Sequence, residues 1–111
     1  EFQSLQSTFE SFPNVTIKYG DFYKLYDTLD NIDLLHVDIA NNRDVYEFVE
    51  TYYLPRLSHR GMVILEGGSE QRDQVSWMKQ YDKPPMNPYV KEMKWKVMGD
   101  MPSLTLVHKP T

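Results

Sequence analysis

Residues 31–69, NIDLLHVDIANNRDVYEFVETYYLPRLSHRGMVILEGGS, contain the pattern from which the fold class follows. Residues 32–37 are a nearly continuous apolar run, which is typical of a strand buried on both faces. Residues 45–52 then repeat apolar side chains at helical spacing, and Gly61 marks a turn into a second apolar strand at residues 62–65. The stretch therefore predicts strand, helix and strand, with Asp38 after the first strand and Glu66 after the second.

The flanking segments extend this alternation. Apolar spacing predicts a helix over residues 4–11, and the β-rich VTIKY at residues 15–19 predicts a strand. We expect a short helix or turn at residues 22–29, a helix capped by Ser69, an irregular proline-rich connection at residues 83–88, and a hairpin of strands 94–98 and 104–108. The order predicts one α/β domain, with a mainly parallel sheet and a C-terminal antiparallel β-hairpin.

Composition narrows the function classes. The 111 residues carry a formal net charge of −4, and Lys and Arg do not cluster, which argues against a nucleic-acid partner. There is no cysteine, which excludes disulfides, thiolate metal sites and cysteine nucleophiles. Apolar runs are too short for a membrane span. The absence of cysteine is compatible with the cytosol, and we expect a cytoplasmic protein.

Several short segments carry a family resemblance. They are VTIKYGDF at residues 15–22, IDLLHVD at residues 32–38, the helix ending in LPRL at residues 54–57, and GMVIL at residues 61–65. In this order and spacing they resemble the C-terminal two-thirds of class I S-adenosylmethionine (SAM)-dependent methyltransferases, a Rossmann-like fold. The resemblance implies the family strand order 3-2-1-4-5-7-6, of which this chain would supply strands 3, 4, 5, 6 and 7.

The resemblance also implies residue roles. Asp21 resembles the acid that accepts from the adenine amino group, with Phe22 beside the ring. Asp38 and the following Ile39-Ala40-Asn41 resemble the loop between methyl donor and acceptor, and Asp38 and Glu66 are the candidate catalytic acids. Related O-methyltransferases hold a divalent metal near these positions, but Gly67-Gly68 replaces their Asp-Asn pair, so no metal ligands are assigned.

The family's glycine-rich loop, E/D-x-G-x-G-x-G, has no counterpart in this sequence. The chain also does not begin with Met, and we expect a fragment of a longer enzyme, a truncated methyltransferase domain that is inactive alone. Without family strands 1 and 2, strand 32–37 would have an open edge. We therefore expect a homo-oligomer through that edge, direct pairing with strand 15–19, or a cover by the N-terminal helix.

Each candidate residue also has a purely structural interpretation. Asp21 would then end a strand and cap the next turn, and Asp38 would cap the following helix. Glu66 would interact with the dipole of a helix. His36 is expected to be a hydrogen-bonded core histidine rather than a base. The leading hypothesis is methyl transfer to a small-molecule or saccharide hydroxyl in the full-length protein. The alternatives are a non-catalytic assembly module and a small-ligand binder that uses Asp38 and Glu66.

Overall fold

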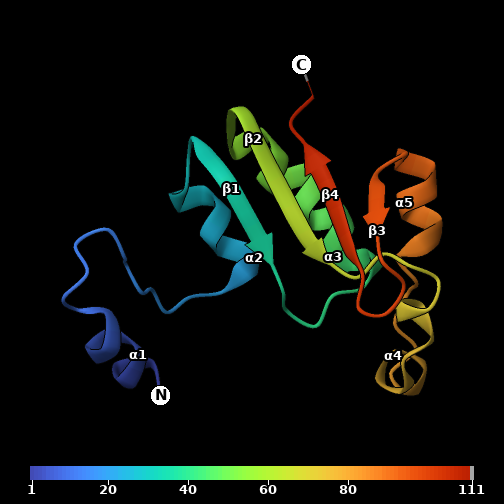
Figure 1. Ribbon diagram of the computed structural model, residues 1–111, viewed down its shortest axis with the longest axis horizontal. Helices are drawn as coiled ribbons and strands as arrows, with labels where there is room; N and C mark the ends of the chain where they lie inside the picture. The colour runs from blue at the N-terminus through green and yellow to red at the C-terminus, as the bar shows by residue number, and fades with distance from the viewer. Residues whose placement is uncertain (111) are drawn as a thin grey trace.

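The computed structural model describes residues 1–110 and contains one open four-stranded sheet (Figure 1). In chain order the elements are α1 (Phe2–Phe9), α2 (Phe22–Leu25), η1 (Tyr26–Thr28), β1 (Ile32–Val37), α3 (Arg43–Phe48), η2 (Val49–Tyr53), η3 (Leu54–Arg56), β2 (Leu57–Glu66), η4 (Arg72–Gln74), α4 (Ser76–Gln80), α5 (Asn87–Met93), β3 (Lys96–Met98) and β4 (Leu104–His108). The strand order is β1-β2-β4-β3.

The sheet is mixed rather than mainly parallel. Only β1 and β2 are parallel, with Leu35 beside Val63, while β2 with β4 and β4 with β3 are antiparallel. The α/β class and the C-terminal hairpin are confirmed, but the expectation of a mainly parallel sheet is wrong. Only the β1–β2 connection contains a crossover helix, and the hairpin contributes both of the other strand pairs.

The strand expected at residues 15–19 is not formed. This segment is extended but has no ladder partner, and no residue before Phe22 belongs to the core or packs against it. β1 therefore keeps an unpaired outer edge within the single chain, and the expected direct pairing is absent. Helix α1 does not cover that edge, because it contains no buried residue and lies apart from the sheet (Figure 1).

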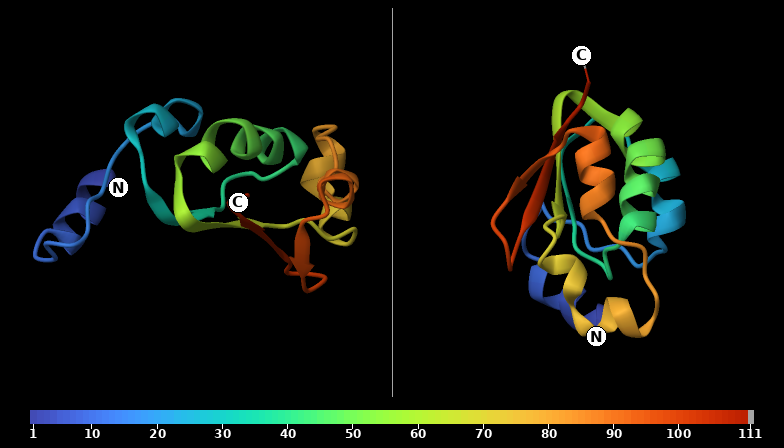
Figure 2. Two further views of the ribbon diagram at one scale, coloured as in Figure 1. Left: turned by 90° about the horizontal axis from the view of Figure 1, so that it is seen from above. Right: turned by 90° about the vertical axis from the view of Figure 1, so that its right-hand side faces the viewer.

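Three of the packed helices, α2, α3 and α5, lie on one face of the sheet (Figure 2). The core between them and the sheet includes Val37, Val45, Tyr46, Val49, Val63, Leu65, Met86, Val90 and Val107. The opposite face remains open, as the 58% exposure of Leu34 illustrates. No helix in the described part of the chain has the length and apolar character of a membrane span.

The crossover from β1 to β2 follows the sequence pattern closely. The Asn42 side chain caps α3 by accepting from the Asp44 amide at 2.8 Å, and the buried Val45 and Tyr46 face the sheet. Beyond Phe48 the helix continues as a π-helical turn and then a 3-10 turn containing Pro55. β2 begins at Leu57, five residues earlier than expected, and its pairing with β1 is irregular before Met62.

Helix α5 was not expected, because its sequence follows a run of prolines. Pro88 lies in the first turn of α5. Proline has no backbone N–H, and at this position the N–H would have no partner within the helix. The Asp73 carboxylate accepts from the backbone amides of Met86 and Asn87, both at 2.8 Å, and so satisfies the free donors at this helix end. The helix expected after Ser69 is split into the short η4 and α4.

Candidate functional site

An open groove of about 410 Å³ lies at the carboxyl end of β1. Its walls come from α2, from the residue after η1, from β1 and the loop after it, and from η2. The lining residues are Phe22, Leu25, Leu29, Leu35, His36, Val37, Asp38, Ile39 and Tyr53. We call this the β1 groove. It is mostly apolar, and Asp38 supplies its one carboxylate.

Aromatic packing holds the Phe22 wall of the groove in place. The Phe22 ring stacks on Tyr53 with centroids 4.9 Å apart, and the Tyr53 hydroxyl donates to the Phe22 carbonyl at 2.6 Å. Burial raises the pKa of Tyr53, so this hydroxyl stays protonated as a donor at neutral pH. Phe22 is thus anchored on the α3–η2 helix although 31 residues separate it from Tyr53.

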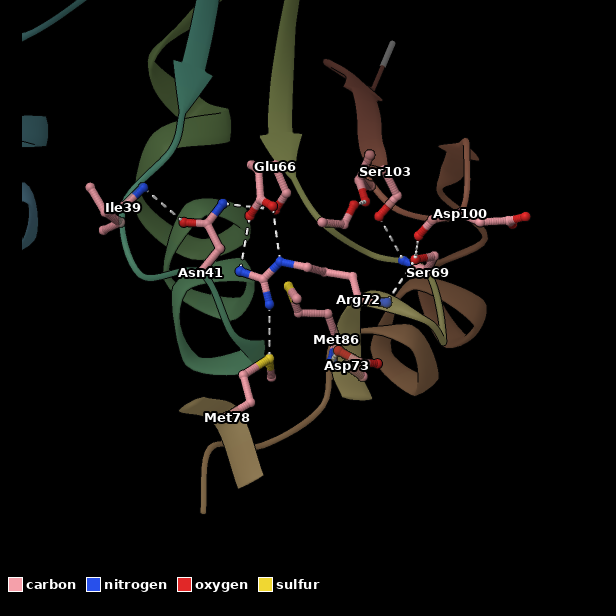
Figure 3. A network of polar contacts seen from close by, with 12 residues as sticks. Ile39, Asn41, Glu66, Ser69, Arg72, Asp73, Met78, Met86, Asp100 and Ser103 are labelled. Atoms are coloured by element: carbon pink, nitrogen blue, oxygen red, sulfur yellow. Dashed lines mark hydrogen bonds and ion pairs between the residues drawn. The ribbon is translucent and has the colours of Figure 1, made fainter. Parts of the chain in front are cut away.

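Asn41 fixes the loop that carries Asp38 and Ile39. Its amide nitrogen donates to the carbonyls of Val37 at 3.0 Å and Glu66 at 2.9 Å, and its side-chain oxygen accepts from the Ile39 amide (Figure 3). Asn41 is fully buried, and its donors and acceptor are paired. One side chain therefore ties the ends of β1 and β2 together and sets the course of the loop at the groove.

Glu66 ends β2, and Arg72 binds its carboxylate. The two guanidinium nitrogens Nε and Nη2 donate to its two oxygens at 2.9 and 3.0 Å, the bidentate geometry that makes such pairs strong. Arg72 also lies over the Trp77 ring, at 5.4 Å from its centroid. Its Nη1 contacts the sulfur of Met78 (Figure 3). The Arg72 side chain is 7% exposed and that of Glu66 is 24% exposed, so this pair is largely withdrawn from solvent.

A second polar network holds the backbone beyond Glu66. The buried Tyr46 hydroxyl donates to the Glu66 carbonyl at 3.1 Å and lies 3.0 Å from the Thr105 hydroxyl, which donates to the Gly67 carbonyl. Burial raises the pKa of Tyr46 well above its ordinary value. Gly68 has a φ of +111° and passes directly against Thr105, where a Cβ atom has no room. Gly68 is therefore needed for the close approach of the backbone to Thr105.

The structure brings three of the predicted site residues together. Phe22, Asp38 and Ile39 line the β1 groove, although Phe22 comes from a segment well before β1. Asp21 is not part of the lining, and its carboxylate accepts from the Tyr23 amide as the cap of α2. Glu66 is also outside the lining and is paired with Arg72. Their assignment to a common site, and the catalytic roles of Asp38 and Glu66, stay predictions.

Three other residues have positions or roles near the strand ends that the sequence did not predict. His36 is exposed on β1 and lines the groove, so the expected core histidine is wrong. Arg72, which binds Glu66, was not singled out by the sequence. Asn41 was expected only as part of the loop after Asp38, and its role in joining the two strand ends was not predicted. Within residues 1–110, no three His, Asp or Glu side chains converge as metal ligands.

Comparisons of the chain with protein-family models, with curated proteins and with solved structures gave no match. The β1 groove, whose lining includes Phe22 and Asp38, is therefore the candidate site on its geometry alone.

Proposed function

We propose that this chain is the acceptor-facing part of a SAM-dependent methyltransferase and contributes the surface that holds the adenosine end of the cofactor. The observation that carries the proposal is the convergence of Phe22, Asp38 and Ile39 on one groove at the carboxyl end of β1. Ligands of sheets with parallel strands bind beyond these strand ends.

The strand order supports the same proposal. The resemblance assigns β1, β2, β3 and β4 to family strands 4, 5, 6 and 7, and the family order ends in 4-5-7-6. The sheet has the order β1-β2-β4-β3, with β4 antiparallel to both neighbours. Three adjacent pairings therefore agree with the family order, and this agreement does not depend on any single motif.

The groove suits one end of SAM and not the other. Its apolar walls, including Phe22, Leu35 and Ile39, fit a flat purine ring, and the Asp38 carboxylate can accept from ribose hydroxyls or an amino group. The glycine-rich loop that would hold the methionine end is absent from these 111 residues. We therefore assign this chain adenosine binding and derive no methyl-transfer step from it. The proposed acceptor, a small-molecule or saccharide hydroxyl, comes from the resemblance.

Two-dimensional ¹H–¹⁵N NMR titration tests the proposal, because it detects weak binding residue by residue. We expect adenosine and S-adenosylhomocysteine to shift the same amides, those of Phe22, Val37, Asp38 and Ile39. Methionine should shift none of them, because this chain lacks the loop for that end of the cofactor. An unchanged spectrum with adenosine at millimolar concentration, or shifts confined to other surfaces, would overturn the proposal.

A matched variant separates the groove from unspecific binding. Asp38→Asn keeps the size of the side chain but removes the charge at the groove, and it should weaken the adenosine shifts severalfold. Glu70→Gln makes the same chemical change at an exposed position whose partner is Lys91, outside the groove, and should leave the shifts as they are.

A further inference from the structure

The N-terminal arm, residues 1–20, carries apolar side chains that the single chain does not bury. α1 has none of its residues buried, and the exposed fractions are 46% for Leu5, 51% for Phe12 and 85% for Tyr19. No hydrogen bond or ion pair in the described residues joins this arm to the body of the chain. The arm is thus an apolar segment without a partner (Figure 1).

The body carries a matching surface that also lacks a partner. Strand register places Leu34 beside Met62, His36 beside Ile64 and Ile64 beside Leu106 on the face opposite the helices. Leu34 is 58% exposed, Met98 50% and Leu104 39%. We call this the open face, and in Figure 2 no helix covers it. Exposed apolar patches of this kind mark interaction surfaces.

The outer edge of β1 borders the open face. It offers a row of unpaired backbone groups, which is a template for another strand. Val15, Ile17 and Tyr19 alternate with Thr16 and Lys18, so a strand of this segment would present one apolar side. Added to the β1 edge, that side would extend the open face beyond Leu34.

Charge also fits the arm to the open face. Glu1 and Glu10 flank α1, while the exposed charged or titratable side chains on the open face are His36, His108 and Lys96. The only acid that the strand register adds to this face, Glu66, is already neutralised by Arg72. A helix that has an acid at each end and an apolar stripe between them therefore meets an apolar face whose exposed lysine is Lys96.

We propose that two copies of this chain exchange their N-terminal arms. Residues 15–19 of each copy add a strand to the β1 edge of the other, and α1 covers the other copy's open face. This twofold exchange buries both unpartnered surfaces at once, which is the general basis of swapped dimers. It gives the expected self-association through the strand edge a defined segment, and it rests on neither the groove nor the cofactor.

The molar mass in solution is the first test. Sedimentation equilibrium of the 111-residue chain should show a mass that rises with concentration from 13.2 kDa to twice that value. Ile17→Pro removes an amide that strand pairing needs, and Leu34→Lys places a charge on the open face. Each should raise the dimer dissociation constant by about tenfold or more, a loss of at least ~1.4 kcal/mol. Ser7→Ala, on the exposed polar side of α1, is the control and should change nothing.

Paramagnetic labelling distinguishes exchange between copies from docking within one chain. The chain has no cysteine, so a spin label on Ser7→Cys is unique. The spin-labelled chain is mixed with ¹⁵N-enriched chain that carries no spin label. We expect broadening of the Leu34 and Ile64 amide signals of the ¹⁵N-enriched chain. A monomer at millimolar concentration, or broadening only when label and ¹⁵N share one chain, would overturn the proposal. Leu34 lies outside the groove lining, so adenosine shifts in Leu34→Lys report on the cofactor site separately.

Discussion

The ends of β1 and β2 are neighbouring strand ends that each carry an acid, yet the two acids have different environments. Both Glu66 oxygens accept from Arg72, and the side chain is 24% exposed. Asp38 is exposed at the β1 groove and has no hydrogen-bond or ion-pair partner for its carboxylate in the described residues. The two environments differ because the chain turns back after Glu66 and brings Arg72, six residues later, against the Glu66 carboxylate. The acid at the end of β2 is therefore held by an internal ion pair, whereas the acid at the end of β1 is exposed and unpaired in the described residues.

The largest expected effect is at Gly68, just beyond β2. Gly68→Ala would place a methyl group against the Thr105 hydroxyl, at a φ of +111° that L side chains rarely adopt. We expect a loss of about 3–5 kcal/mol in the free energy of unfolding, measured by urea denaturation. Gly20→Ala is the control, because its added methyl meets only the flexible Leu25 side chain, and it should cost about 1 kcal/mol or less. Equal costs would contradict a tightly packed β2 end.

The next effect concerns the ion pair itself. Arg72→Ala leaves the Glu66 carboxylate without its partner and removes the contact with Trp77, so the free energy of unfolding should fall by roughly 2–4 kcal/mol. Lys91→Ala breaks the pair with Glu70, whose two side chains are 68% and 70% exposed, and should cost ~0.5 kcal/mol or less. Similar urea midpoints for the two variants would show that the Glu66–Arg72 pair is no more important than a surface pair.

Tyr46 gives a smaller effect with a characteristic pH dependence. Tyr46→Phe removes the hydroxyl between Thr105 and the Glu66 carbonyl and should cost about 1–2 kcal/mol at neutral pH. Burial raises the pKa of Tyr46, so the folded chain retains a proton that the unfolded chain releases above pH ~10. The stability this proton provides is complete below pH ~10 and is lost above it, by up to about 1.4 kcal/mol per pH unit.

Comparing the two proteins at high pH isolates this contribution. Tyr53 and Tyr89 also have raised pKa values and contribute to the alkaline loss in both proteins. The difference in unfolding free energy between the original chain and Tyr46→Phe should therefore shrink as the pH rises from 9 to about 11. A difference that stays constant across this range would show that the Tyr46 hydroxyl is not protected by burial.

The sequence predicted the β1–α3–β2 unit well because its signals are local. The apolar run of β1, the Asn42 cap and the helical spacing of Val45 and Val49 all act over a few residues. The prediction of a strand at residues 15–19 was wrong because strand formation is not local. A β-rich segment becomes a strand only where it can hydrogen-bond to another strand, and the segment itself does not determine that partner.

Some residues of the candidate site could be predicted from the sequence, and others could not. Asp38 follows directly from its place after β1, and the resemblance supplied Phe22 and Ile39. The pairing of Glu66 with Arg72 depends on the turn at Gly67 and Gly68, both of which have positive φ. The pattern of apolar residues does not determine the direction of that turn, so the pairing was not predicted. Helix α5 was missed because its cap, Asp73, comes from a distant segment rather than from the residue before the helix.

The smallest expected stability effect is at Asp38, and it divides the two strand ends most sharply. Asp38→Asn should change the free energy of unfolding by ~0.5 kcal/mol or less, because the carboxylate is exposed and holds no partner, yet it should weaken the adenosine-induced NMR shifts. Glu66→Gln should do the reverse: it removes the charge opposite the largely buried Arg72, costs about 1–3 kcal/mol, and leaves the adenosine shifts intact. If both variants affected stability alone, the end of β1 would be as structural as the end of β2. If both affected the shifts alone, Glu66 would belong to the ligand site despite its pairing with Arg72.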